Sequence, residues 1–204
     1  MREGPGMTEQ EWLACDYASS MLELLRGKAS ERKLRLFAVA CCRLLWPLMT
    51  DERSQAAVEA AEQYADGLIS REQLRAAAKE AFAVIAEPLP GLKLKHTARV
   101  HPRKQASQLA RRIAAEAAVE VSTPHLDADN VAFVAVGADG ERRTAEAGDG
   151  VPRAGDWEAQ CIVLRDVFQS PFRPGAHDSS WLMPDIVSLA RHIYSERTWD
   201  CLPA

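Results

Sequence analysis

The five cysteines are the side chains best suited to redox, nucleophilic or metal chemistry, and their positions indicate buried thiols. Cys41 and Cys42 are adjacent within the apolar run 36–42, and Cys161 follows Trp157 by four residues, as on one face of a helix. A reactive thiol needs a lowered pKa and access to solvent, which an apolar setting does not provide. An odd number of cysteines with an adjacent pair also fits no disulfide framework, so we expect reduced thiols in a cytoplasmic protein.

The histidines and glycines form no metal-binding or catalytic pattern. The five histidines occur without a Cys-x-x-Cys pair or a His-Glu-x-x-His motif, so we predict no metal site. Residues 177–180 (His-Asp-Ser-Ser) contain the residue types of a hydrolase triad, but neighbours in one loop do not orient a base toward a nucleophile. Residues 148–150 (Gly-Asp-Gly) lack the further residues of a phosphate-binding loop. The sequence therefore predicts no catalytic residue and no cofactor, and we expect a protein that is not an enzyme.

Residues 88–115 carry positive charge without a single acidic residue. The seven cations of this segment are Lys93, Lys95, Arg99, Arg103, Lys104, Arg111 and Arg112. Such a block can lie along a phosphate backbone, which makes nucleic-acid binding one hypothesis. The segment lacks the aromatic residues that stack on single-stranded bases, and the net charge of −4 does not favour nucleic acid. The second interpretation is a solvated segment whose cations meet acidic residues such as Glu52 and Glu59.

The composition excludes several other classes of protein. The chain has 204 residues, of which 47% are hydrophobic and 26% charged, as in ordinary globular proteins. The longest apolar stretch, residues 34–49, contains Arg35, Arg43 and Pro47, and is shorter than the roughly 18 apolar residues that span a bilayer. Residues 1–6 contain no apolar core of a secretion signal. We therefore expect a protein without a membrane association.

Capping signals and apolar stripes predict consecutive helices in the first half of the chain. Thr8 with Glu11, and Ser70 with Gln73, have the form of the capping box, in which side chain and backbone at a helix start bond reciprocally. Ser30 caps a longer helix that reaches about residue 46. Because residues 36–42 are apolar on every face, we expect this helix to be buried all round at the centre of the core. Alanine-rich stripes predict further helices over about 57–68, 70–87 and 103–121.

The composition changes at Ser122. Residues 122–155 hold five of the eleven glycines and a single apolar run, 131–136, whose β-branched residues favour a strand or one arm of a small β hairpin. A loop of this length is unusual in a compact domain, so we interpret residues 122–155 as a flexible insertion or linker. Helical spacing returns at 157–168 and again after Pro184, where proline is tolerated in a first helical turn.

Three segments resemble a much-duplicated, uncharacterised family of all-helical planctomycete proteins. They are residues 31–43 (Glu-Arg-Lys-Leu-Arg-Leu-Phe-Ala-Val-Ala-Cys-Cys-Arg) with Trp46, residues 51–67 beginning Asp-Glu-Arg-Ser, and residues 164–197 with Leu-Arg-Asp-Val-Phe, Pro-Phe-Arg-Pro and Ile-Tyr-Ser-Glu-Arg. The resemblance implies an all-α fold with a variable, alanine-rich middle, and it implies no activity or cofactor. This chain has Gln169 and Ser170 where a Gly-Asn turn is common in the family.

Together these features predict an all-α bundle of about six to eight helices. We expect an N-terminal helical region over 1–121, the insertion over 122–155, and C-terminal helices over 156–204 that pack on the same core. The most favoured function is a non-enzymatic module that binds another protein. The alternative is a nucleic-acid-associated protein that uses the basic residues from Lys93 to Arg112, and a third is an enzyme whose site is assembled from distant residues.

Overall fold

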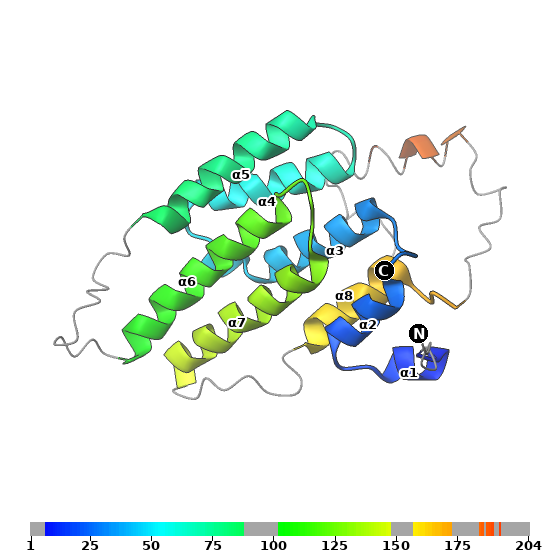
Figure 1. The fold of residues 1–204 in the computed structure, drawn as a ribbon, viewed down its shortest axis with the longest axis horizontal. Coiled ribbons are helices and arrows are strands. Elements are labelled where there is room, and N and C mark those ends of the chain that lie inside the picture. The colour runs from blue at the N-terminus through cyan, green and yellow to red at the C-terminus, as the bar shows by residue number, and fades with distance from the viewer. Residues whose placement is uncertain are drawn as a thin grey trace, which may run out of the picture. The chain divides into compact units, whose positions relative to one another are not determined.

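The computed structural model describes residues 7–87, 102–147 and 157–172, together with 184, 185, 187–189 and 192, giving only the backbone for 102–106 and 139–147. Every regular element in these residues is helical, which confirms the predicted all-α fold (Figure 1). In chain order the elements are α1 (Glu9–Ala14), α2 (Ala18–Leu25), α3 (Glu31–Leu44), the 3-10 helix η1 (Trp46–Leu48), α4 (Glu52–Ala65), α5 (Arg71–Ala86), α6 (Pro102–Val121), α7 (Ala128–Ala147) and α8 (Glu158–Phe168).

The chain divides into two compact units, residues 1–171 and 172–204. Helices α1 to α8 belong to the first unit. In the second unit the described residues from Pro184 to His192 are helical, at the start of the helix predicted after Pro184, and the rest of that prediction lies outside the described residues. None of the helices in the described ranges combines the length and apolar character that crossing a bilayer requires.

The predicted capping residues begin the helices of the first half. The Thr8 hydroxyl accepts a hydrogen bond from the Glu11 amide (3.2 Å), and the Glu11 carboxylate accepts one from the Thr8 amide (2.7 Å). Ser70 and Gln73 form the same capping box at α5. These pairs satisfy backbone amides that a helix start otherwise leaves without a partner. The caps therefore set where α1 and α5 begin.

Helix α3 lies at the centre of the first unit and contacts α4, α6, α7 and α8. Phe37, Cys41 and Cys42 are fully buried, as predicted. The prediction that this helix is buried all round is wrong for Leu36 and Ala40, which are only half-buried. Helix α3 meets its neighbours on most of its circumference but not on all of it, so one narrow stripe stays in contact with solvent.

Helices α6 and α7 form an antiparallel hairpin with the most extensive contact in the protein (Figure 1). The predicted linker and strand are therefore wrong for residues 128–147, which form α7. The buried side of α7 is Ala128, Val131, Ala132, Ala135 and Ala138, spaced three and four apart as on one face of a helix. Residues 148–155 of the predicted linker lie outside the described residues. The β-branched residues are accommodated because the long-range contact with α6 outweighs their local preference for a strand.

Helix α8 attaches α1 to the core. It contacts α2 and α3, and the indole N–H of the fully buried Trp12 donates to the carbonyl of Gln169 (3.1 Å) just beyond its end. Arg165 of α8 donates to the carbonyls of Trp12 and Cys15 at the end of α1. Gln169 has a φ of +55°, a conformation that glycine adopts without steric strain. This explains physically why a glycine is suited to this position.

Phe37→Ala is expected to lower the free energy of unfolding by about 3–5 kcal/mol, because it removes a ring from a close-packed core. Chemical denaturation of the variant measures this loss. The matched control is Phe82→Ala on α5, where the ring is 58% exposed, and a change below about 1 kcal/mol is expected there. Equal losses for the two variants would contradict the central position of α3.

Gly137→Ala is expected to stabilise the protein by roughly 0.5–1 kcal/mol, since alanine replaces glycine inside a helix. An added Cβ would lie 3.9 Å from Cγ2 of Ile113, which is ordinary van der Waals contact. The control is Gly67→Ala, which should destabilise because Gly67 has a φ of +71°. Thermal melts of both variants make the measurement, and no gain for Gly137→Ala would favour a flexible segment over α7.

Candidate binding surfaces

The predicted basic segment is described in part. Lys93, Lys95 and Arg99 lie outside the described residues. Arg103 and Lys104 lie in the first turn of α6, where the structure gives the backbone alone. Arg111 and Arg112 follow in the middle of α6 with their side chains described. The structure therefore brings two of the seven predicted contact residues to a defined place.

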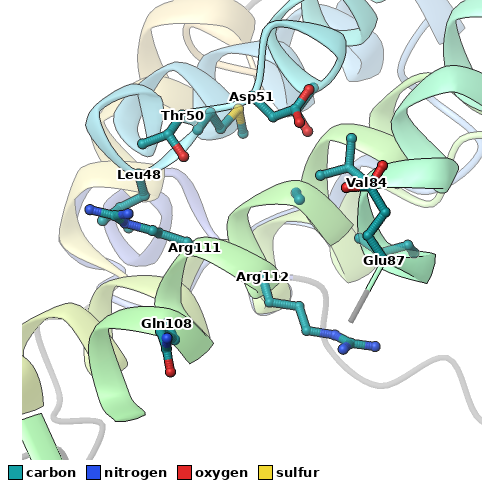
Figure 2. A pocket seen from close by; sticks show the side chains of 12 residues that line it. Leu48, Thr50, Asp51, Val84, Glu87, Gln108, Arg111 and Arg112 are labelled. Atoms are coloured by element: carbon teal, nitrogen blue, oxygen red, sulfur yellow. The ribbon is translucent and has the colours of Figure 1, made fainter. Parts of the chain in front are cut away.

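Arg111 and Arg112 line a cleft of about 480 Å³, which we call the Arg111 cleft. Its walls come from the η1–α4 corner, the end of α5 and the middle of α6. Figure 2 shows the two guanidinium groups diverging from α6, that of Arg111 toward the side of Leu48 and that of Arg112 toward the side of Glu87. The lining residues are Leu48, Met49, Thr50, Asp51, Ser54, Val84, Ile85, Glu87, Gln108, Arg111, Arg112 and Ala115.

Most charges around the Arg111 cleft are paired. Arg53 donates to both oxygens of Asp51 (2.8 and 3.0 Å) and to Glu87 (2.8 Å), which joins the start of α4 to the end of α5. The hydrogen bonds from the Arg53 side chain hold the pKa of Asp51 below its usual value. Arg112 contacts Glu116 one turn along α6 (3.4 Å). Among the described residues, no carboxylate lies within 4.0 Å of the exposed Arg111 guanidinium.

Ser54 is a buried polar residue in the wall of the Arg111 cleft. It is 1% exposed, and its hydroxyl has no hydrogen-bond partner among the described residues. Buried hydroxyls in native proteins are nearly always hydrogen-bonded, because leaving one unsatisfied costs free energy. This serine is therefore an exception that calls for a physical explanation.

A second surface joins residues that are far apart in the sequence. Tyr17, which precedes α2, and Phe133 of α7 both pack on Trp157, with ring centroids 5.0 and 6.4 Å from that of Trp157. Tyr17 and Phe133 line a shallow groove of about 410 Å³ with Ser19, Asp127, Asp129 and Asn130, which we call the Tyr17 groove. No lysine or arginine is among these lining residues.

The acidic residues of the Tyr17 groove also organise the backbone around it. Asp127 accepts a hydrogen bond from the Asn130 amide (3.0 Å) and so caps the start of α7. Asp129 accepts one from the Ser19 hydroxyl (2.6 Å) in the first turn of α2, where a helix dipole favours negative charge. The groove is thus held in shape from two helices and keeps an acidic edge.

The cysteines that the structure describes are free thiols, and three of them are buried. Burial raises the pKa of Cys41 and Cys42 well above the ordinary value for a thiol. Burial likewise raises the pKa of Cys161 to about 11. The buried positions predicted for these three thiols are confirmed, and a raised pKa lowers the population of the reactive thiolate.

The remaining sequence candidates give no assembled site within the described ranges. In this part of the chain, no group of three or more His, Cys, Asp or Glu side chains converges as metal ligands would. His96, His101 and the segment 177–180 lie outside the described residues. His125, which the structure describes, lies 3.4 Å from Arg71 at an exposed contact.

Comparison with protein-family models, with curated proteins and with solved structures finds no match for this chain. The resemblance to planctomycete proteins therefore stays a prediction.

Sequence reasoning missed both Ser54 and the Tyr17 groove. Ser54 reads as one more polar residue near a helix start, and only its burial sets it apart. Tyr17, Phe133 and Trp157 are separated by more than a hundred residues in total, and Phe133 was part of the predicted strand. The available signal for Phe133 would have been an apolar aromatic residue on the solvent-facing side of a helix, where it is unusual.

Native labelling with iodoacetamide at pH 8 should modify the half-buried Cys15 well before Cys41, Cys42 or Cys161. With a pKa of about 11, roughly one Cys161 thiol in a thousand is ionised at that pH. Peptide mass spectrometry reports each site separately, and unfolding in denaturant should make all of them react. Rapid native labelling of Cys41 or Cys42 would show that α3 is not in the core.

Proposed function

We propose that this protein is a non-enzymatic helical module that binds a segment of another protein in the Tyr17 groove. The observation that carries this proposal is the exposure of two aromatic rings, Tyr17 and Phe133, beside two carboxylates, Asp127 and Asp129. Tyr17 is 48% and Phe133 is 66% exposed, although both rings pack on Trp157. Ordered aromatic side chains in contact with solvent are typical anchor residues of protein interfaces.

The chemistry of the groove favours a basic partner. Asp127 and Asp129 give its edge a negative charge that no lining cation neutralises. The faces of Tyr17 and Phe133 also attract cations, because an aromatic ring carries negative charge on its face. A segment with lysine or arginine next to an apolar residue would satisfy both the carboxylates and the rings. The small size of the groove favours a short segment over a large flat interface.

The free thiols support a cytoplasmic location for this module. Cys15, Cys41, Cys42 and Cys161 carry no disulfide, and adjacent buried thiols such as Cys41 and Cys42 are usual in reducing compartments.

The nucleic-acid alternative rests on Arg111, which is exposed and has no ion pair among the described residues. Against it, Arg112 is paired with Glu116, and the carboxylates of Asp51 and Glu87 line the same cleft. Binding along a phosphate backbone needs several unpaired cations, since affinity for nucleic acid depends on neutralising many phosphates, and one unpaired arginine supplies little of this. We therefore favour binding to a protein segment.

A library of random synthetic 12-residue peptides tests the proposed function. Peptides retained by the protein should be enriched in lysine or arginine beside leucine, isoleucine or phenylalanine. Phe133→Ser and Asp129→Asn should each weaken binding of the selected peptides by about tenfold or more, because they remove an anchor ring and a charge. Fluorescence anisotropy with a labelled selected peptide makes the measurement.

The matched control is Leu68→Ser, which removes a side chain that is 72% exposed at the end of α4, outside the groove. Its peptide affinity should equal that of the unchanged protein. Enrichment of acidic peptides, or equal binding by the Phe133→Ser variant, would refute the proposal. A salt-sensitive gel shift with DNA that disappears in an Arg111→Ala, Arg112→Ala double variant would favour the nucleic-acid alternative instead.

A further inference from the structure

The Arg111 cleft has the properties of a small-molecule site that is separate from the Tyr17 groove. At about 480 Å³ it falls within the usual range for ligand pockets. It lies where η1 and α4, α5 and α6 meet, so three segments of the first unit hold its walls. The Tyr17 groove shares none of its lining residues.

Part of the cleft wall is apolar. Met49 is 2% and Ala115 is 6% exposed, and Val84 and Ile85 at the end of α5 are half-buried. These residues provide a surface for the apolar body of a ligand, which gains free energy by leaving water.

The hydroxyl of Ser54 supplies an unsatisfied polar group in the same wall. Ser54 sits in the first turn of α4, and a serine there usually hydrogen-bonds to the backbone or to solvent. Here the side chain is 1% exposed, and its oxygen meets no partner among the described residues. The unsatisfied hydroxyl is thus a property of the wall itself, and alanine at this position would leave no such deficit.

The charges of the cleft favour an anionic head group on one side. On the α4–α5 side, Arg53 bridges the carboxylates of Asp51 and Glu87, so that this side keeps one net negative charge and does not attract an anion. On the α6 side, Arg112 is engaged by Glu116, while Arg111 points toward the side of Leu48 without an ion pair among the described residues (Figure 2). Arg111 is therefore the cation available to an incoming anion, and a guanidinium suits the two oxygens of a carboxylate or phosphate.

We propose that the Arg111 cleft binds a small amphipathic anion. Its carboxylate or phosphate head contacts Arg111, and its apolar body lies against Met49, Val84 and Ala115. Carboxylate and phosphate heads share this recognition chemistry, and the two are separate arms of the test.

Isothermal titration calorimetry with octanoate, octyl phosphate and the neutral octanol tests this proposal on the whole chain. Octanoate or octyl phosphate should bind with saturation at one site, and octanol at least about tenfold more weakly, because it lacks the charge that Arg111 recognises. The anion that binds more tightly identifies the head group.

Arg111→Gln should weaken binding of the anion by about tenfold or more and abolish the preference over octanol. The matched control is Arg75→Gln, which changes an exposed arginine of α5 outside the cleft and should leave the affinity unchanged. Ser54→Ala is a second control: the hydroxyl that it removes is buried in the wall and has no partner among the described residues, so both the affinity and the melting temperature should be maintained.

A Val84→Trp variant adds a steric test, because a large ring on the wall of the cleft should block the ligand. Absence of saturable binding for both anions up to millimolar concentration would overturn the proposal. Equal affinity for octanol, or an Arg111→Gln variant that binds as the unchanged protein does, would also overturn it. Phe133→Ser, which alters the Tyr17 groove, should leave anion binding intact, so failure at one surface is distinguishable from failure at the other.

Discussion

The buried guanidinium of Arg35 is the interaction on which the arrangement of the helices depends. Arg35 is 1% exposed in the middle of the core helix α3. It donates to the carbonyls of Val121 and Thr123 (both 2.8 Å) and of Pro124 (3.4 Å), where α6 ends and the chain turns toward α7. A helix end leaves carbonyls without partners, and a cation beside them also opposes the negative end of the helix dipole. Arg35 therefore fixes the α6–α7 turn to α3.

Two further contacts offset the cost of burying the Arg35 guanidinium. Glu31 lies one turn earlier on α3 and accepts a hydrogen bond from Arg35 (3.2 Å), and the guanidinium also lies 5.1 Å from the ring centroid of Tyr64 on α4. Burying a charge is costly unless hydrogen bonds and an opposite charge compensate for it. Lysine cannot replace this arrangement, because an ammonium group lacks the planar fork that reaches several carbonyls at once. One side chain thus connects α3, α4, the end of α6 and the turn that leads to α7.

The alanine-rich hairpin of α6 and α7 needs a contact, such as that of Arg35, that fixes the position of its turn. Its buried side chains are largely small: Ala110, Ala114, Ala117 and Ala118 on α6, and mostly alanines and valines on α7. Small side chains let two helices approach closely, but each one buries little apolar area. The contact between α6 and α7 is therefore stabilised by its length, which spans several helical turns. It is also stabilised by the loop between the two helices, which sets their register at one end. The Arg35 bonds supply that register.

The sequence predicts those parts of the structure that depend on neighbouring residues, and it misses those that depend on residues far apart along the chain. The capping boxes at Thr8 and Ser70 and the buried position of Phe37 depend on neighbours in sequence, and all were predicted correctly. Helix α7 was missed because the β-branched run 131–136 weighed more than the helical spacing from Ala128 to Ala138, and only contact with α6 decides between them. In the sequence, Arg35 counts only as a charge within the apolar stretch 34–49, since the carbonyls that accept from its side chain are more than eighty residues away.

The candidate surfaces likewise divide into features that neighbouring residues signal and features that arise only from contacts between distant segments. Arg111 and Arg112 were identified from charge alone, and Glu116 follows Arg112 by four residues, a spacing that lets two side chains pair on one helix. The Tyr17 groove combines two distant segments, around Tyr17 and from Asp127 to Phe133, and no local pattern could have joined them.

Arg35 and Ser54 are two buried polar side chains with opposite consequences. Each of the two lies in a core-facing position of a central helix, and each is 1% exposed. Arg35 is surrounded by acceptors, so it stabilises one arrangement of the helices and leaves no capacity for a ligand. The Ser54 hydroxyl has no partner among the described residues, so it adds nothing to the folded state that alanine would not supply. The wall of the Arg111 cleft therefore contains a buried polar group of a kind that folded proteins usually avoid. A buried polar group therefore says more about function here when fewer of its hydrogen bonds are made within the protein.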